Sequence, residues 1–460
     1  MNNDFDPYQM VHYVIDLVEK HDNSIQCCEA YLGKDMYLNI DVEENAIKYS
    51  REGLERGISV RVFDRKGRCG FSFTNRMDKN NLEEIVQKAL QLMKGATPDA
   101  EFHDLPPQVE SYPKIKQLCD AKIKAMKIDD ASHHIIDAIE VCKNDETAIS
   151  QSAYFKSNYS QIFILNSNGV EVNYKETSCS ISSNMIAKDK TTNETSFGQE
   201  WQVERNLNDL NAQEVAQNAL EIAKNNLNRK KIKNMNVPLV LTPRGAISLI
   251  LRPISLAIDA ENFQFNRSFL IGHKGKKIGS KLLTIEDNGL IDGAIGSSIS
   301  DDEGTPCQNK TIIKEGMFLE NGLIHNSYTA AKEGVKSTGN AVRTSYASSP
   351  GIGVTNFSLK LGSSAKEEII RDIKKGILLD YTGDSPNIST GDFSGLILQG
   401  NLIEDGKILY ALNETMLANH LLELFSNITA ISEESKTYGR FTAPFVKIEN
   451  ANIIGSAPKK

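Results

Sequence analysis

The chain has 460 residues, of which 40% are hydrophobic and 24% charged, with a formal net charge of -8. These values are typical of a folded protein with an ample core, and the acidic balance argues against nucleic-acid binding. Its seven cysteines form no CxxC, which argues against a disulfide framework or a zinc ribbon. Residues 1–7 lack the pattern of a signal peptide, and no run approaches the roughly 18 apolar residues of a membrane span. We therefore expect a cytoplasmic protein without membrane contact.

Residues 1–110 are predicted to form an N-terminal α/β domain. Asp6 followed by Pro7 is typical of a helix start, and apolar residues at helical spacing follow. Alternating apolar and polar residues from residue 57, with a turn at Gly67, predict a hairpin over residues 57–74. A second apolar stripe predicts a helix that is closed by Gly95.

Residues 111–233 are predicted as a middle α/β region, after a proline-rich connector over residues 96–113. Asp129 and Asp130 are expected to cap a helix that runs to Cys142. The Asn168-Gly169 pair lies between two β-type runs and predicts a hairpin. A polar helix follows over residues 212–227, and the basic residues 229–233 are interpreted as a solvated linker.

Residues 234–460 are predicted as a C-terminal domain that is mainly β with a few helices. Glycine is frequent there, and short apolar runs are separated by turns. Helical patterns occur near residues 245–258, 364–374 and 416–425. The predicted fold class is therefore α/β (α+β), with hairpins and helices in the N-terminal half.

Common catalytic motifs are absent from the sequence. There is no HExxH and no GxSxG, and the glycines at 395 and 400 are followed by Asn401 where a phosphate loop needs lysine. Among the scattered histidines, only His133 and His134 are neighbours. Adjacent helical residues point about 100° apart, so this pair cannot chelate one ion from a helix.

A series of short motifs runs through the C-terminal half. Each is weak alone, but their order along the chain is specific. They are VPLVLTP (237–243), NRSFL (266–270), KGKKIGS (274–280), SDDEGTP (300–306), ENG (320–322), SYTA (327–330), STGNAVR (337–343), VTN (354–356), STGDFS (389–394) and IEDG (403–406).

Together these motifs resemble the TldD/TldE (PmbA) family, and RGISVRV at residues 56–62 fits that family's first region. The resemblance covers nearly the whole chain. It implies a heterodimeric zinc metalloprotease that acts on unfolded peptides or leader peptides. In the TldD-type subunit, a helix after the strand-proline element carries HExxxH, and a cysteine near the C-terminus completes the metal site. Such ligands hold Zn²⁺, which activates a water molecule beside a glutamate base.

This sequence departs from the zinc motif at each point. The corresponding helix, residues 249–258, reads LILRPISLAI and contains neither histidine nor glutamate. Pro253 occupies the motif's position and is expected to kink the helix. Residues 436–442 contain no cysteine, and the last cysteine is Cys307. The pattern resembles the TldE/PmbA-type subunit, so we expect no catalytic residue, metal ligand or cofactor here, and zinc only in a TldD-type partner.

Three short segments are candidates for a substrate groove. The acidic loop at residues 301–304 could bind a divalent cation, although an Asx-type turn is favoured. The polar 337–340 loop could present N–H groups to a peptide or hold two β segments together, and both interpretations stay open. The third segment, residues 355–356, precedes a predicted strand over residues 357–360. The edge of that strand could pair with a peptide, although an ordinary paired strand is favoured. The candidate residues are Asp301, Asp302, Glu303, Ser337, Thr338, Gly339, Asn340, Thr355 and Asn356.

The leading functional prediction is a non-catalytic subunit that pairs with a TldD-type chain or with itself and binds peptide substrate. Two alternatives stay open. One is a stand-alone homodimeric peptide-binding protein. The other is a metallopeptidase with an unrecognised site, in which the Asp301 loop binds a different cation.

Overall fold

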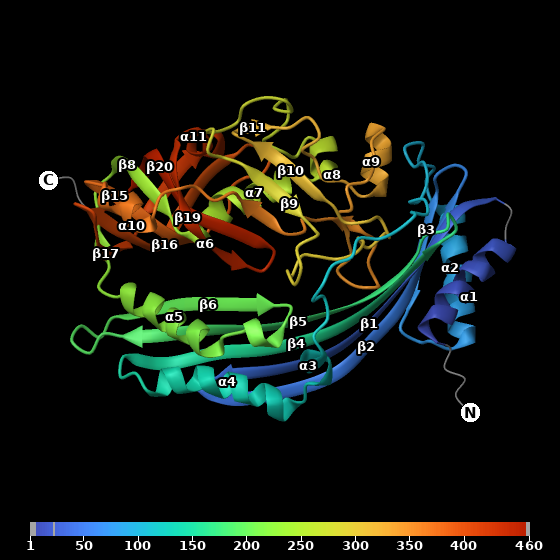
Figure 1. The fold of residues 1–460 in the computed structure, drawn as a ribbon, viewed down its shortest axis with the longest axis horizontal. Coiled ribbons are helices and arrows are strands. Elements are labelled where there is room, and N and C mark those ends of the chain that lie inside the picture. Colours follow the sequence, from blue (N-terminus) through green and yellow to red (C-terminus); the bar gives the residue numbers. More distant parts are fainter. Residues whose placement is uncertain (1–5, 22–23, 457–460) are drawn as a thin grey trace.

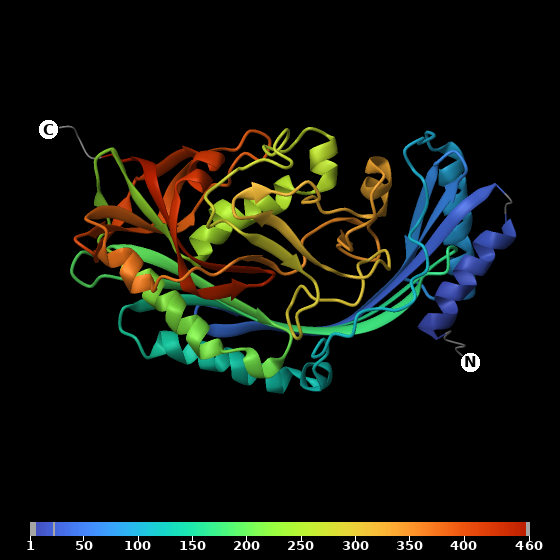
Figure 2. The same cartoon turned by 45° about the horizontal axis from the view of Figure 1, so that its top comes forward.

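The computed structural model describes residues 6–21 and 24–456, and these form two packed bodies. A long, curved sheet makes up most of the N-terminal body, and the C-terminal body sits in its concave side (Figures 1 and 2). The predicted α/β class is confirmed. The prediction that no signal peptide is present rests largely on residues 1–5, which lie outside the described residues.

The N-terminal sheet is antiparallel throughout its described strands. The predicted hairpins are confirmed: β2 pairs with β3 through Phe63 and Cys69, and β4 and β5 close around Asn168-Gly169. The division predicted at residue 110 falls in the connector between β3 and β4, and strands from both sides join one sheet. In spatial order the strands are β3 (Cys69–Thr74), β2 (Ala46–Asp64), β1 (Ile25–Glu43), β4 (Ala148–Asn166), β5 (Glu171–Lys188) and β6 (Thr195–Glu204).

Helices cover the convex face of this sheet (Figure 1). Side chains alternate between the two faces of a strand, so Leu32 and Ile40 of β1 pack beneath helices. The alternate residues Tyr31 and Asp35 face the C-terminal body and line a cavity there. The helices are α1 (Pro7–His21), α2 (Lys79–Gly95), α3 (Ala121–Ala125), α4 (Ile128–Lys143) and α5 (Ala212–Asn225), with a short 3₁₀ turn η1 (Leu207–Asp209).

Most predicted N-terminal helices are confirmed, and one cap is corrected. Helix α1 begins at Pro7 and α2 ends at Gly95, as expected. At α4 the cap residue is Lys127, and the two aspartates lie within the first turn. The Asp130 carboxylate accepts the N–H of Lys127, so an acidic side chain still completes the helix start.

The C-terminal body is built on a large mixed sheet. Its central strand, β20, pairs with β14 and β8 along one side and with β19 and β18 along the other. The boundary predicted near residue 233 falls between β7 and β8. The strands are β7 (Lys230–Lys231), β8 (Met235–Leu241), β9 (Ile285–Asn288), β10 (Asn309–Lys314), β11 (Met317–Phe318), β14 (Phe357–Leu359), β15 (Lys375–Thr382), β16 (Asp392–Glu404), β17 (Lys407–Asn413), β18 (Met416–His420), β19 (Ile428–Tyr438) and β20 (Phe441–Ile454), beside the small pair β12 (Ala341–Val342) and β13 (Gly351–Ile352).

The helices of this body are short, and one prediction is wrong. The helix expected over residues 416–425 is strand β18 followed by α11. Leu417, Leu421 and Leu424 are spaced as on a helix, but β18 pairs with β16 and β20, and sheet pairing overrides the local pattern. The helices are α6 (Pro243–Ala246), α7 (Arg252–Ala257), α8 (Ala260–Gln264), α9 (Ser327–Glu333), α10 (Lys366–Arg371) and α11 (Leu421–Ser426).

The predicted helix over residues 245–258 is present and is distorted near Pro253. Between α6 and α7 the backbone forms a π-helical turn, η2 (Ile247–Leu251). Proline has no N–H to donate to the carbonyl four residues earlier, and a widened turn accommodates that loss. The expected distortion is therefore confirmed, as a π turn.

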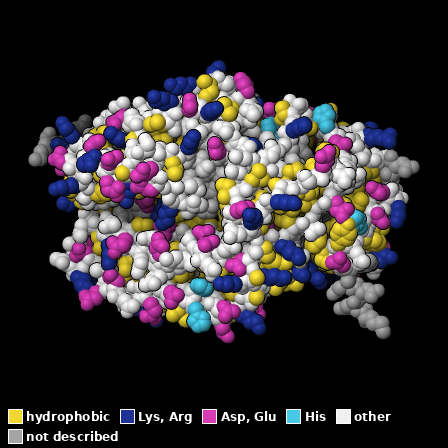
Figure 3. Space-filling view, in the orientation of Figure 1, with side chains coloured by type: hydrophobic (Ala, Val, Ile, Leu, Met, Phe, Trp, Pro, Cys, Tyr) yellow, Lys and Arg dark blue, Asp and Glu magenta, His cyan; other side chains and the backbone are white. Residues whose placement is uncertain are grey.

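Charged side chains of both signs are interspersed over the face of the molecule in Figure 3, without a broad basic stripe. Within residues 6–21 and 24–456, no helix is both long and apolar enough to cross a bilayer.

Candidate functional site

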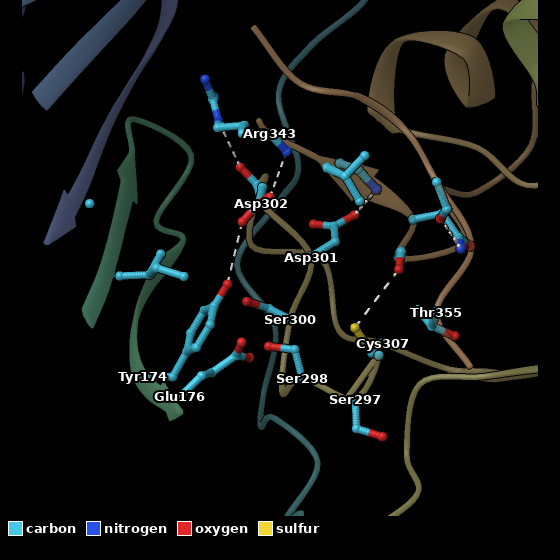
Figure 4. Close-up of a pocket in the computed structure, with 18 of the residues that line it drawn as sticks. Tyr174, Glu176, Ser297, Ser298, Ser300, Asp301, Asp302, Cys307, Arg343 and Thr355 are labelled. Atoms are coloured by element: carbon cyan, nitrogen blue, oxygen red, sulfur yellow. Dashed lines mark hydrogen bonds between the residues drawn. The ribbon is translucent and has the colours of Figure 1, made fainter. Parts of the chain in front are cut away.

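A polar cavity of about 240 Å³ lies between the concave face of the N-terminal sheet and loops of the C-terminal body (Figure 4). The sheet contributes Tyr31 from β1, and Tyr174 and Glu176 from β5. The C-terminal body contributes residues between 295 and 302 and between 339 and 346. Strand alternation determines the lining, because residues 172, 174 and 176 share the concave face of β5.

Asp302 is one of the acidic residues that line this cavity. Its carboxylate accepts a hydrogen bond of 2.6 Å from the N–H of Arg343 and one of 3.4 Å from the Tyr174 hydroxyl. Burial, together with the nearby charge of Glu176, raises the pKa of Asp302 to about 6. The group can therefore hold or release a proton near neutral pH.

Asp301 has a structural role in its loop. One carboxylate oxygen accepts the N–H groups of Glu303 and Thr305, and the other accepts that of Ala341. This is the Asx-type turn favoured from the sequence. In the described part of the chain, no three His, Cys, Asp or Glu side chains are placed to hold one metal ion.

Glu303 points away from the cavity into a buried ion network between the two bodies. Its carboxylate lies 2.9 Å from the Arg61 guanidinium, which also contacts Glu29 at 2.7 Å. Arg343 forms a further ion pair with Glu29. Both glutamate side chains are 1% exposed, so their negative charges are balanced by the arginine guanidinium groups rather than by water.

The predicted 337–340 segment is divided between two cavities. Gly339 and Asn340 line the polar cavity, whereas Ser337 and Thr338 face a larger one of about 1210 Å³. The larger cavity is bordered by the proline-rich connector near residues 103–109. This segment also joins neighbouring β segments, because the Asn340 amide donates to the Gly353 carbonyl.

Replacing Gly339 with alanine is expected to lower the free energy of unfolding by about 2–4 kcal/mol. Its φ of +69° costs an L-residue about 1–2 kcal/mol, and a Cβ atom there would lie 2.4 Å from the Pro306 carbonyl oxygen, which adds strain. Gly334 is the matched control, with a φ of +68° and no atom within 4 Å of an added Cβ. Urea unfolding of both variants measures the difference, and equal losses would contradict the predicted clash.

Thr355 and Asn356 are both tied into the fold. The Thr355 N–H and hydroxyl donate to Asp287, and the Asn356 amide donates to Ser297 and to a main-chain carbonyl. The strand that follows, β14, pairs with both β9 and β20. The alternative of an open edge for peptide addition is therefore wrong, and the favoured paired strand is confirmed. Only Thr355 of this pair lines the polar cavity.

Comparison with known proteins covers almost the whole chain. Models of three PmbA/TldA metallopeptidase domains match in order: domain 1 over residues 28–92, the central domain over 105–227 and the C-terminal domain over 234–455. The chain belongs to the PmbA/TldD family.

Individual members of the PmbA/TldD family are similar over nearly their full lengths. An uncharacterized protein of Methanocaldococcus jannaschii is 29% identical over 91% of this chain and 94% of its own. A metalloprotease PmbA homologue of Buchnera aphidicola is 25% identical over 93% of each chain. The crystal structure of TldE from Thermococcus kodakarensis has a TM-score of 0.85 at 22% identity, covering 97% of this chain and 100% of that one.

In this PmbA/TldD-family chain, the helical segment after the strand-proline element is packed into the core. Leu249, Ile250 and Ile254 are all at most 1% exposed and belong to the largest hydrophobic cluster. Thr242 caps the segment at its start, with its hydroxyl accepting the Gly245 N–H. The inward face of this helix therefore presents methyl groups and no polar side chain.

Several residues of the site were not anticipated from the sequence. Tyr174 and Glu176 come from a strand more than 120 residues before Asp302, and alternation within β5 was the available signal. Arg205 is 3% exposed at its side chain and donates to carbonyls of the 294–297 loop, which fixes one wall of the cavity. No local pattern in the sequence marks such a contact between the two bodies.

Proposed function

We propose that this chain is the non-catalytic TldE/PmbA-type subunit of a TldD–TldE metalloprotease complex in the cytoplasm. The complex would act on unfolded peptides or leader peptides, with zinc held by a TldD-type partner. The observation that carries the proposal is the helical segment of residues 249–258. Where the family's HExxxH is expected, the chain has a buried apolar face and Pro253.

Zinc does not fit the residues present in this part of the chain. Zinc sites use histidine, cysteine or carboxylate ligands, and LILRPISLAI supplies none. The region near residues 436–442 is also without cysteine, and the buried Cys307 thiol has a pKa raised by burial, which disfavours the thiolate that binds metal. No catalytic step is therefore assigned to this chain.

The two cavities beside residues 337–340 support a peptide-binding role. The larger one has space for a stretch of extended chain, and the polar one is suited to a charged or hydrogen-bonding group. A subunit of this kind would complete the substrate chamber of its partner.

Mixing experiments test the proposal. We expect this chain alone to contain substoichiometric zinc and to leave an unstructured peptide intact, whereas a mixture with the TldD-type chain of the same organism cleaves it. The measurements are zinc content, complex mass by light scattering, and peptide hydrolysis. A partner variant with the glutamate of its HExxxH replaced by glutamine is the control, because it should form the complex without activity.

Other outcomes would favour the alternatives. Stoichiometric zinc and hydrolysis by this chain alone would contradict the proposal and favour a metallopeptidase with its own site. Failure to associate with any TldD-type chain of the same cell would favour a stand-alone homodimeric peptide-binding protein.

A further inference from the structure

The polar cavity contains hydrogen-bond acceptors that the fold itself leaves unused. Ser300 is 1% exposed, and among the described residues its hydroxyl oxygen has no hydrogen-bond partner. Figure 4 shows it directed toward Tyr174, with the Glu176 carboxylate, the Ser298 hydroxyl and Asp302 around the same space. A buried hydroxyl without a partner carries a free-energy cost, which a bound ligand would remove.

Carboxylates at the cavity keep oxygen atoms available. Within the described residues, the Asp302 carboxylate accepts only the Arg343 N–H and a long hydrogen bond from the Tyr174 hydroxyl. One oxygen of Glu176 contacts Arg205 at 3.1 Å, and within the described chain its other oxygen has no hydrogen bond. Asp35 adds a third carboxylate to the lining. The cavity therefore offers acceptor oxygens on several negatively charged side chains.

The arginines near the cavity use part of their hydrogen-bond donors on other groups. Arg343 has a fully buried side chain that pairs with Glu29 and donates to main-chain carbonyls. Arg205 is also bonded to main-chain carbonyls. Arg440 is exposed and donates to the Val354 carbonyl. Apart from the Arg205–Glu176 contact, these guanidinium bonds do not involve the acceptor side chains of the cavity.

We propose that this cavity binds the primary ammonium group of a peptide, with Asp302, Glu176 and Ser300 as its acceptors. An ammonium carries three N–H donors and one positive charge, which matches a hydroxyl between two carboxylates. An anion would be repelled by the same groups. The volume of about 240 Å³ compares with roughly 30 Å³ for one water molecule, so the cavity admits the ammonium and its first residue.

The ammonium can come from a peptide N-terminus or from a lysine side chain, and blocked peptides distinguish the two. The inference rests on the proposed function only in its choice of peptides as probes. Calorimetric titration of the chain alone with trialanine, N-acetyl-trialanine amide and N-acetyl-lysine amide measures the contribution of each amine. We expect at least one free amine to bind at least about tenfold more tightly than N-acetyl-trialanine amide.

Two variants locate the binding at the cavity. Ser300→Ala removes a hydroxyl that no residue in the described part of the chain uses, so the fold should be unaffected while amine affinity falls at least about fivefold. Asp302→Asn keeps an oxygen for the Arg343 N–H and removes the charge, and affinity should fall at least about tenfold. Asp372→Asn, at a side chain that is 73% exposed, is the control and should bind as the unaltered protein does.

Preference for trialanine would assign the site to a peptide N-terminus, and preference for N-acetyl-lysine amide would assign it to a lysine side chain. Equal binding of the blocked peptide, or unchanged amine affinity in both cavity variants with native unfolding midpoints, would overturn the inference. Absence of amine binding at millimolar concentration would also overturn it. Because these titrations use the chain alone, their failure is distinct from a failure to form an active complex with a TldD-type partner.

Discussion

Replacement of Arg61 by methionine is expected to lower the free energy of unfolding by about 3–5 kcal/mol. The Arg61 guanidinium lies between Glu29 and Glu303, at 2.7 and 2.9 Å, and both carboxylates are 1% exposed. Methionine preserves much of the side-chain volume but leaves Glu303 buried without a cation. Because Glu303 belongs to the C-terminal body and Arg61 to β2, the variant should weaken the attachment between the two bodies.

Urea unfolding at neutral pH measures this loss. Arg51→Met is the matched control. Arg51 lies on the same strand, its side chain is 70% exposed, and its ion pair with Asp41 is long, at 3.7 Å. Exposed pairs of this kind contribute about 0–1 kcal/mol. Similar losses in the two variants would contradict the role assigned to the buried network.

The same network predicts how acid affects the protein. Burial alone would raise the pKa of Glu29, but the Arg61 and Arg343 guanidinium groups hold it below its ordinary value. A carboxylate with a lowered pKa stabilises the folded state above its unfolded pKa, and this contribution is lost as pH falls through the folded pKa. Arg61→Met removes one of these cations, so its deficit relative to the unaltered protein should shrink as pH falls from 7 toward 4. A deficit that is constant over that range would exclude this linkage.

Local sequence signals predicted those elements whose formation depends on neighbouring residues. The Asn168-Gly169 turn and the alternation that ends in the hairpin near Gly67 are local in this sense, and both are present. Strand β1 was not predicted, although it lies at the centre of the N-terminal sheet between β2 and β4. Its sequence mixes small, polar and charged residues, such as Gly33 and Asp35, because one face meets helices while the other lines a polar cavity.

The site was predicted only in part, because its residues meet through contacts between distant parts of the chain. The acidic loop at residues 301–303 is a recognisable motif, but its three side chains have separate roles. Asp301 completes a turn, Asp302 faces the cavity and Glu303 joins an ion network. The role of Asp302 depends on Tyr174, which is 128 residues away, and that of Glu303 depends on Arg61 of β2. A single sequence contains the residues of such contacts but not their proximity.

Asp287 holds Thr355 and Asn340, two residues of the cavity lining, and its replacement by alanine is expected to lower the free energy of unfolding by about 3–5 kcal/mol. Its side chain is fully buried and accepts the N–H and hydroxyl of Thr355 and the amide of Asn340. The ammonium of Lys310 lies 3.1 Å away and balances its charge. Alanine would leave the Thr355 N–H without this acceptor and Lys310 without its counter-ion.

A double-mutant cycle tests whether this cost comes from an uncompensated charge. Lys310→Met alone would leave the Asp287 carboxylate buried without a cation and should cost about 3–5 kcal/mol. The double variant Asp287→Ala/Lys310→Met removes both charges, so its loss should be smaller than the sum of the single losses by at least about 1 kcal/mol. Additive losses would mean that the pair does not interact. Because Thr355 and Asn340 line the cavity, the Asp287→Ala variant should also bind the preferred amine, trialanine or N-acetyl-lysine amide, more weakly under conditions where it remains folded.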